Sequence, residues 1–193
     1  MKFLKIALAC VGLVIVSAPV AAQTAADSDK LIDAVKKDDG SAGAQLIEDH
    51  PTIINAKDST GNTALIIAIT RSDPAWTGFL LNNGADPNLG GAGGDTPLIA
   101  ASRVGFDDAA GWLLSMGAKI DGTNRMGETP LMIAVQRRNL PMVKRFLGAG
   151  ADPDRTDSAA GYSARDYARR DSRARDIQKL IDNKKPKPAA ALN

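Results

Sequence analysis

A motif that recurs every 33 residues constrains the fold of this chain more than any other feature. The segment Gly61–Leu65 (GNTAL) returns as Gly94–Leu98 (GDTPL) and again as Gly127–Leu131 (GETPL). The same step links three further sets of identical residues: Ala68, Ala101 and Ala134; Leu81, Leu114 and Leu147; and Gly84, Gly117 and Gly150. A repeat of this length predicts stacked supersecondary units, each of which must cover the apolar face of its neighbour.

Each copy carries the signals of two helices. Its motif contains a threonine that can cap the first helix, because the hydroxyl accepts a hydrogen bond from a free backbone N–H at the helix start. These threonines are Thr63, Thr96 and Thr129. A second helix is expected to begin near Pro74, Phe106–Asp107 or Pro141. Its apolar side chains recur at helical spacing: Trp76, Phe79, Leu80 and Leu81; Ala109, Trp112, Leu113 and Leu114; and Met142, Val143, Phe146 and Leu147. The glycines that close each copy suit the left-handed conformation in which helices commonly end.

The TPL motif that opens the first helix and the GADP motif that follows the second resemble the ankyrin repeat. The match is strong over residues 58–156, with repeats at about 58–90, 91–123 and 124–156, and weaker copies flank it at about 27–57 and 157–183. The resemblance implies an all-α solenoid of about five helix pairs, two of them degenerate caps, over residues 23–183. Ankyrin scaffolds bind many unrelated proteins, so it implies protein binding without identifying the partner.

One position departs from the usual ankyrin motif TPLHxA. The histidine of that motif ties neighbouring repeats by hydrogen bonds, and its place is taken here by Ile66, Ile99 and Met132. We therefore expect apolar contacts to make these ties.

The first and last copies resemble caps of the stack. Helices are expected over residues 29–38 and 42–48, with charged side chains facing outward. In the last copy, Arg165 takes the place of the buried leucine and Asp166 follows it, which predicts a solvated end face. Residues 184–193 (KKPKPAAALN) are charged and contain proline, so we expect a disordered basic tail.

Residues 1–22 have the three parts of a secretory signal peptide. Two lysines precede the apolar segment Ile6–Val16, and small residues follow it up to a predicted cleavage site before Gln23. The apolar segment is shorter than the about 20 residues of a membrane span, with an uncleaved anchor as the alternative. We discount a lipoprotein site at Cys10, because apolar residues continue past it. The sequence therefore predicts a periplasmic or secreted protein, similar to small exported bacterial ankyrin-repeat proteins.

Composition limits the chemistry of the mature chain. Cleavage would remove two of the 24 basic residues, leaving 22 against 22 acidic ones, and would also remove the only cysteine. Disulfides, thiolate metal sites and cysteine nucleophiles are then excluded. The single histidine, His50, lies in a loop and cannot alone build a usual zinc site, and no nucleophile turn accompanies it. Aromatic residues at 4% argue against a base-stacking surface for nucleic acid. We expect no catalysis, cofactor or metal.

Two features have both a structural and a functional interpretation. The glycine-rich segment Gly90–Gly94 lacks the GxGxxG spacing and the GK[ST] ending of nucleotide-binding loops, so a flexible finger between repeats is favoured. Trp76 and Trp112 are large enough to anchor a partner. Their places on the apolar side of the second helix favour packing in the core instead.

Cations recur at the end of each first helix. They are Lys36/Lys37, Arg71, Arg103, Arg137/Arg138 and Arg169/Arg170. In the repeat frame they fall on one or two positions, so they are expected to line up on the concave face that ankyrin proteins turn toward their partners. One interpretation is that cations favour helix C-termini, where each contributes about 0.3–1 kcal/mol. The other is a basic stripe that binds an acidic partner.

The predicted partner-binding site combines this stripe with the tips of the loops between repeats. Its residues are Arg71, Arg103, Arg137 and Arg170 on the helices and Asn62, Asp95, Arg125, Met126 and Glu128 on the loops. Residues 157–193 hold nine basic and five acidic groups, so an acidic ligand is expected to favour the C-terminal half. The functional hypothesis is a monomeric, non-enzymatic module that scaffolds, sequesters or inhibits a protein in the bacterial envelope. The alternative is a structural component that tethers cell-surface material.

Overall fold

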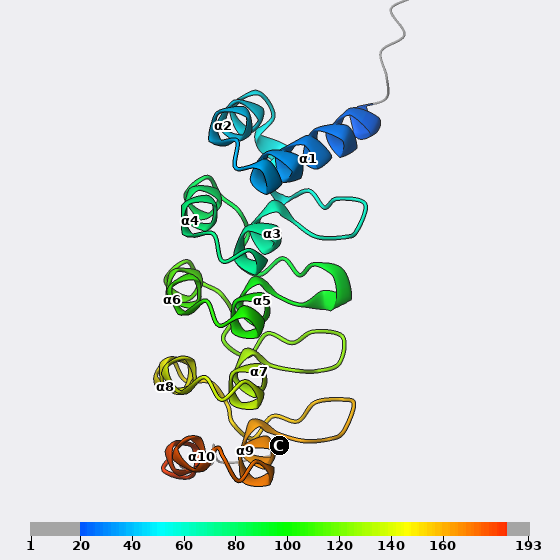
Figure 1. Cartoon of the computed structure of the whole chain (residues 1–193). Coiled ribbons are helices and arrows are strands. Elements are labelled where there is room, and N and C mark those ends of the chain that lie inside the picture. Colours follow the sequence, from blue (N-terminus) through cyan, green and yellow to red (C-terminus); the bar gives the residue numbers. More distant parts are fainter. Residues whose placement is uncertain (1–19, 185–193) are drawn as a thin grey trace, which may run out of the picture.

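The computed structural model describes residues 20–184, and the side chains from residue 26 onward. Within this range the chain forms five helix pairs that stack along one axis (Figure 1). The elements are α1 (Val20–Lys37), α2 (Gly40–Asp49), η1 (Pro51–Asn55), α3 (Ala64–Thr70), α4 (Pro74–Asn82), η2 (Ala92–Gly94), α5 (Pro97–Val104), α6 (Asp107–Ser115), α7 (Pro130–Gln136), α8 (Leu140–Gly148), α9 (Ala164–Arg170) and α10 (Arg175–Asp182). The predicted signal peptide before Val20 and the predicted tail beyond Lys184 lie outside the described residues.

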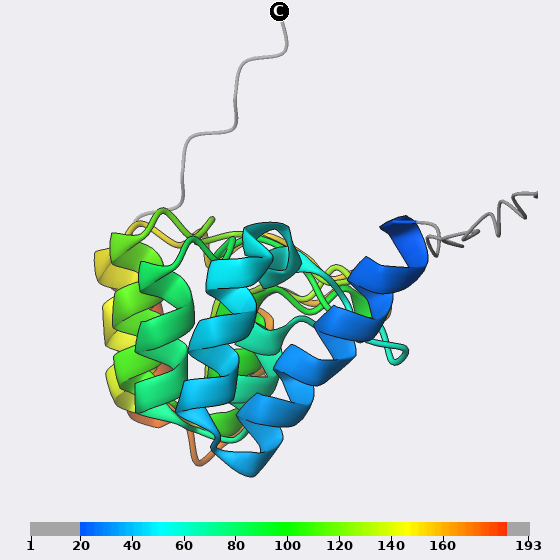
Figure 2. The ribbon, with the colours of Figure 1, turned by 90° about the horizontal axis from the view of Figure 1, so that it is seen from above.

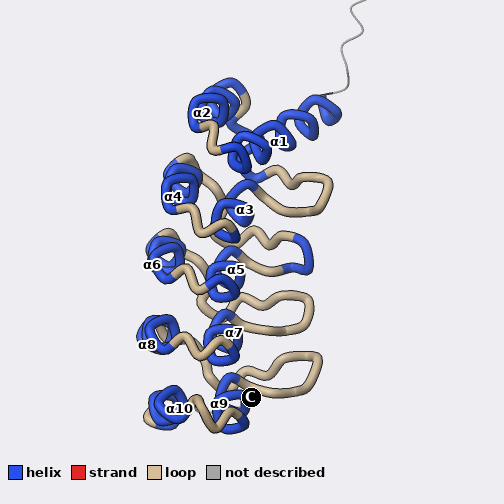
Figure 3. Tube along the Cα trace, viewed as in Figure 1, coloured by secondary structure: helices blue, strands red, loops and turns tan. Residues whose placement is uncertain are grey.

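The stack has three layers. The first helices of the pairs form the central layer, the second helices lie on one side of it, and the loops between pairs project from the other side (Figures 1 and 3). Viewed down the stack, these loops point in one common direction (Figure 2). We call them the fingers, and we call the exposed surface of the fingers and first helices the inner face. Each first helix packs against the first helix of the next pair. The predicted all-α repeat solenoid is confirmed.

The predicted helix boundaries of the central repeats are also confirmed. The hydroxyl of each motif threonine accepts a hydrogen bond from the backbone N–H three residues later, at 3.2–3.3 Å. The glycines that close these repeats have φ between +87° and +91°, a left-handed conformation that glycine adopts without steric cost. The predicted leucine and alanine positions of the first helices are at most 1% exposed: Leu65, Leu98, Leu131, Ala68, Ala101 and Ala134.

The prediction for the leucines of α6 is wrong at one position. The repeat predicts that Leu114 shares the buried environment of Leu81 and Leu147, which are at most 4% exposed, but Leu114 is only half-buried. Leu113 is fully buried instead. The core contact of this helix is therefore made mainly by Leu113.

The prediction for the tryptophans is correct for one and wrong for the other. Trp76 is buried, with 3% exposure, whereas Trp112 is 37% exposed. The repeat frame explains the difference, because Trp76 aligns with the buried Ala109. Trp112 aligns instead with Phe79, which is half-buried, and with Arg145, whose side chain is 39% exposed.

The two ends of the stack differ from their predictions. Helix α1 begins at Val20 rather than near residue 29, and it projects beyond the rest of the stack (Figures 1 and 2). At the other end, the Arg165 side chain is only 11% exposed and is not solvated as predicted. Its guanidinium pairs with Asp154, in the turn after α8, at 2.6 Å and with Asp182, at the end of α10, at 3.0 Å, because its many donors find acceptors in both places. Asp166 is half-buried and accepts hydrogen bonds from Ser163 at the start of α9.

Neighbouring repeats are tied by apolar contacts and by hydrogen bonds. The residues in place of the motif histidine are at most 4% exposed, in agreement with the expected apolar ties. In addition, the side-chain oxygens of Asn55, Asn88 and Asp121 each accept a hydrogen bond from the backbone N–H 31 residues later, at 2.8, 2.8 and 3.1 Å. These three acceptors are themselves 33 residues apart. Neighbouring repeats are therefore held together by both kinds of contact, and the fingers project from this stack.

Candidate partner-binding face

The centre of the inner face holds a closed polar network between two repeats. At the end of α5, Arg103 binds Asp95 through Nε at 2.6 Å and Nη2 at 3.1 Å, and Nη2 also donates to Glu128 at 2.9 Å. Asn124, which is 7% exposed, donates to both carboxylates at 2.9 and 2.8 Å. The network joins the finger before α5 to the finger before α7.

This network alters the ionisation of its members. Burial raises the pKa of Asp95, but hydrogen bonds from Arg103 and Asn124 outweigh it, so the pKa lies below its ordinary value. The contact with Asp95, followed by that with Glu128, raises the pKa of Arg103. One cation thus faces two carboxylates, and the charge of Arg103 is compensated inside the protein.

The four arginines of the predicted stripe occupy two different positions. Arg71 and Arg137 are the C-cap residues of α3 and α7. Both are exposed, and neither forms an ion pair with the described residues. Between them, at the same repeat position, lies the exposed Val104 rather than a cation. Arg103 and Arg170 lie one residue earlier in the last turn of their helices and bind residues of the fingers. The structure therefore does not have a row of four free cations.

The predicted finger residues divide in the same way. Arg125 and Met126 are exposed at the finger before α7, and Met126 is 49% exposed. Asn62 is partly buried, and its Oδ1 accepts a hydrogen bond from the Ala92 N–H at 3.0 Å. Asp95 and Glu128 are engaged with Arg103. Among the predicted finger residues, Arg125 and Met126 are therefore the two whose side chains are exposed and available to a partner.

The glycine-rich finger is explained by close backbone approach. A side chain at Gly91 would place its Cβ 2.5 Å from Oδ1 of Asn62 and 2.7 Å from Cδ1 of Ile66. The Gly93 carbonyl accepts a hydrogen bond from the Arg125 N–H at 3.2 Å, which joins this finger to the next. These contacts support a finger between repeats, but they tie it to its neighbours rather than leave it flexible as expected.

A comparison with protein families completes these observations. A family model described as ankyrin repeats (3 copies) matches residues 31–124 and 78–157. The chain belongs to the ankyrin-repeat family. A comparison with curated proteins found no relative that matches this ankyrin protein. Ankyrin repeats are generally protein–protein interaction modules and typically non-enzymatic, so the inner face is the natural candidate for a binding surface.

The C-terminal end of the ankyrin inner face contains two tyrosines that sequence reasoning missed. The Tyr167 hydroxyl donates a hydrogen bond to Asp157, which is 4% exposed. Burial, and then this bond, raises the pKa of Tyr167 to about 12. The rings of Tyr162 and Tyr167 meet edge to face at 5.8 Å. Arg170 lies over the Tyr162 ring at 4.4 Å and donates to its hydroxyl at 2.9 Å. Asn124 was missed as well, although it continues the 33-residue step from Asp157.

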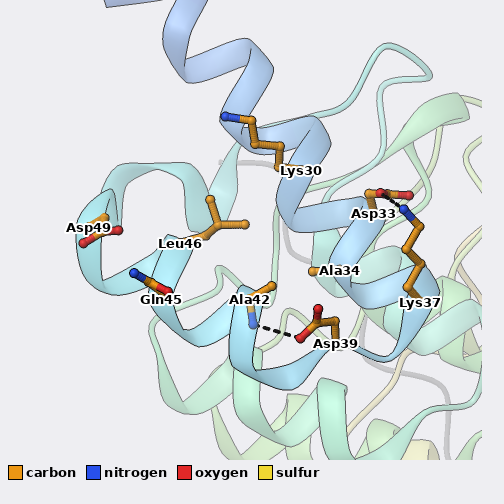
Figure 4. Close-up of a pocket in the computed structure, with 9 residues that line it drawn as sticks. All are labelled: Lys30, Asp33, Ala34, Lys37, Asp39, Ala42, Gln45, Leu46 and Asp49. Carbon is orange, nitrogen blue, oxygen red and sulfur yellow. Dashed lines mark hydrogen bonds and ion pairs between the residues drawn. The ribbon is translucent and has the colours of Figure 1, made fainter.

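The N-terminal end of the ankyrin stack has a hollow of about 400 Å³ between α1 and α2 (Figure 4). Ala42 and Leu46 contribute apolar surface, and charged side chains surround it. Lys37 pairs with Asp33 at 2.7 Å, and Asp39 caps α2 by accepting from the Ala42 N–H at 3.0 Å. These contacts suit the polar outer side of a terminal repeat.

The described residues also bear on metal binding, membrane spans and the place of His50. No group of three His, Cys, Asp or Glu side chains in that range could hold a metal ion. None of the described helices is long and apolar enough to cross a membrane. His50 Nε2 lies 3.6 Å from the carboxylate of Asp27, which also binds Lys30 at 2.7 Å. This contact joins α1 to the turn after α2 and gives His50 a structural role.

Proposed function

We propose that this ankyrin protein binds a partner protein through its inner face and thereby scaffolds, sequesters or inhibits that partner in the bacterial envelope. One observation carries the proposal: the inner face is held rigid by hydrogen bonds, and it exposes side chains that are free to contact a partner. Hydrogen bonds between fingers and the Arg103 network hold the inner face in place. Arg71, Arg137, Arg125 and Met126 are exposed on it. A preorganised surface binds with a smaller entropy cost.

An acidic partner fits this surface best. Arg71 and Arg137 are exposed and have no carboxylate partner among the described residues. The C-terminal segment 157–193 adds an excess of four positive charges, from nine basic and five acidic residues. Such a field favours the approach and orientation of a negatively charged protein. Arg125 and Met126 would then add specificity at the finger tip.

The envelope location rests on the sequence of residues 1–22. We expect the precursor to be cut before Gln23, which lies in the first turns of α1. N-terminal sequencing of the native protein recovered from the periplasm should begin at Gln23. Recovery of a chain that retains Met1 would contradict the export proposal.

The binding proposal is tested by charge reversal on the inner face. The wild type should recover a partner as an equimolar soluble complex. The variant Arg71→Glu/Arg137→Glu should not recover it. The matched control, Lys144→Glu/Lys179→Glu, has the same change in net charge on exposed positions of the outer helices α8 and α10. Equal recovery by both double variants would contradict binding by the inner face. Sedimentation of all forms with cell-wall material, without a soluble complex, would favour a tethering role.

A further inference from the structure

An open cleft of about 410 Å³ lies on the inner face between the end of α7 and α9. Gln136 forms one side of it, and Tyr167, Arg170, Asp171 and Arg173 form the other. The cleft is next to the tyrosine pair and at the end of the molecule where basic residues are in excess.

Guanidinium groups outnumber carboxylates at this cleft. Arg138 binds Asp171 at 3.0 Å, and Arg173 binds the same carboxylate at 3.2 Å. Arg170 has a tyrosine hydroxyl as its partner rather than an acid. Three arginines therefore face two carboxylates, Asp171 and the buried Asp157 that binds Tyr167, which leaves an excess of one positive charge. Each guanidinium has five N–H donors, and the Arg138 and Arg173 side chains are 42% and 73% exposed, so donors remain available to a ligand.

The centre of the inner face lacks this excess. There, the charge of Arg103 is compensated by Asp95 and Glu128, which occupy its donors. An acidic segment that lies along the inner face would find few free donors at the Arg103 network and more of them at the C-terminal end. The charge distribution thus selects one end of the face.

The cleft is also preorganised. Asp157 accepts the Tyr167 hydroxyl and three backbone N–H groups of its own finger, so Tyr167 is held in place. The ring of Tyr162 packs on Tyr167 and supports Arg170 from below. Tyrosine and arginine in a fixed arrangement are the residue types that dominate binding energy at protein interfaces.

We propose that this cleft binds a carboxylate-rich segment of the partner protein, with Arg170 and Arg173 as the groups that contact the carboxylates. Arginine binds carboxylates through paired, charge-assisted hydrogen bonds, and this geometry gives specificity as well as energy. The inference rests on the proposed protein-binding function and names the part of the partner that the C-terminal end of the inner face recognises.

An acidic peptide serves as the probe for this cleft and stands in for the carboxylate-rich segment. Fluorescein-labelled deca-glutamate is titrated with the mature protein and its anisotropy is followed, with deca-glutamine as the uncharged probe. We expect binding of the glutamate peptide only. The variant Arg170→Gln/Arg173→Gln should weaken it by about tenfold or more, because charged hydrogen bonds are lost. Arg173→Gln alone, at an exposed position, should weaken it while leaving the unfolding midpoint unchanged.

Three results would overturn the inference. One is no binding of deca-glutamate, and another is equal weakening by Lys144→Gln/Lys179→Gln, which has the same charge change on the outer helices. The third is displacement of the peptide by inorganic pyrophosphate at equal concentration, which would indicate a phosphate site. If the native partner is lost from Arg71→Glu/Arg137→Glu but retained by the Arg170/Arg173 variant, the cleft inference fails and the proposed function stands. If the peptide binds as expected but no partner is recovered by the wild type, the proposed function fails and the cleft remains.

Discussion

Arg103 binds Asp95 through two nitrogen atoms, at 2.6 and 3.1 Å, and the same guanidinium reaches Glu128 of the next repeat. In the sequence, Arg103 resembles the other cations that end first helices. In the structure it joins two repeats, and its removal would leave two carboxylates close together without a cation.

We therefore predict that Arg103→Glu lowers the free energy of unfolding by about 2 kcal/mol, the order expected when hydrogen bonds to a charged group are lost. Arg71→Glu is the matched control, because Arg71 is exposed and has no such partner. It should change stability by less than about 0.5 kcal/mol. Urea denaturation of both variants and the wild type measures this difference. Equal stability of the two variants would show that the network contributes nothing.

Gly43 of α2 is predicted to be required for packing against α4. A Cβ at this position would lie 2.2 Å from Cη2 of Trp76. The indole is buried and its Nε1 donates to Asp38 at 3.0 Å, so it cannot move without breaking another contact. Gly43→Ala should therefore destabilise the protein by about 1–3 kcal/mol.

A second glycine provides the control for Gly43. Gly78 lies within α4, and no atom lies within 4 Å of a Cβ built there. Gly78→Ala should stabilise the protein by about 0.5–1 kcal/mol, since alanine favours the helix. A rise in thermal unfolding temperature for both variants would contradict the packing argument for Gly43.

The sequence predicted the fold well because the repeat satisfies several physical requirements at the same positions. Capping threonines, closing glycines and buried leucines recur with one step, so each copy confirms the others. The partners of individual side chains were not predictable in this way. Arg71 and Arg103 differ by one position in the repeat frame, and one residue on a helix rotates a side chain by about a quarter of a turn. Because of that rotation, Arg71 is exposed, whereas Arg103 is enclosed by two carboxylates.

The aromatic residues show the same limit. Trp112 fits the apolar spacing of its helix as well as Leu113 does, because positions three and four residues from Ala109 both satisfy the pattern. Only the packing of neighbouring repeats decides which of the two is buried. The tyrosines of the C-terminal cleft were missed because Asp157, which accepts the Tyr167 hydroxyl, lies in the preceding finger and matches no motif of the first helix.

Leu113 and Leu114 allow a direct test of which leucine forms the core of α6. Leu113→Ala should lower the free energy of unfolding by about 2–5 kcal/mol, because a fully buried leucine leaves a cavity. Leu114→Ala should cost less, since Leu114 is half-buried. Hydrogen exchange should show that Leu113→Ala loosens the repeats on both sides, because repeats contact only their neighbours. A larger loss for Leu114→Ala would favour the leucine position that the repeat pattern predicts.

Tyr167 should give the protein a distinct alkaline transition. Burial, followed by the hydrogen bond to Asp157, raises its pKa from 10.0 to about 12. Because the folded state holds the phenol proton more tightly than the unfolded state, this stabilisation is complete below pH 10 and is lost as the pH rises toward 12. The chain has two tyrosines, so absorbance titration of tyrosinate should resolve one group that ionises near the upper value. The variant Tyr167→Phe should remove that group and reduce the loss of stability above pH 10. If the variant and the wild type titrate and unfold with the same alkaline profile, the pKa of Tyr167 is not raised by burial and by the hydrogen bond to Asp157.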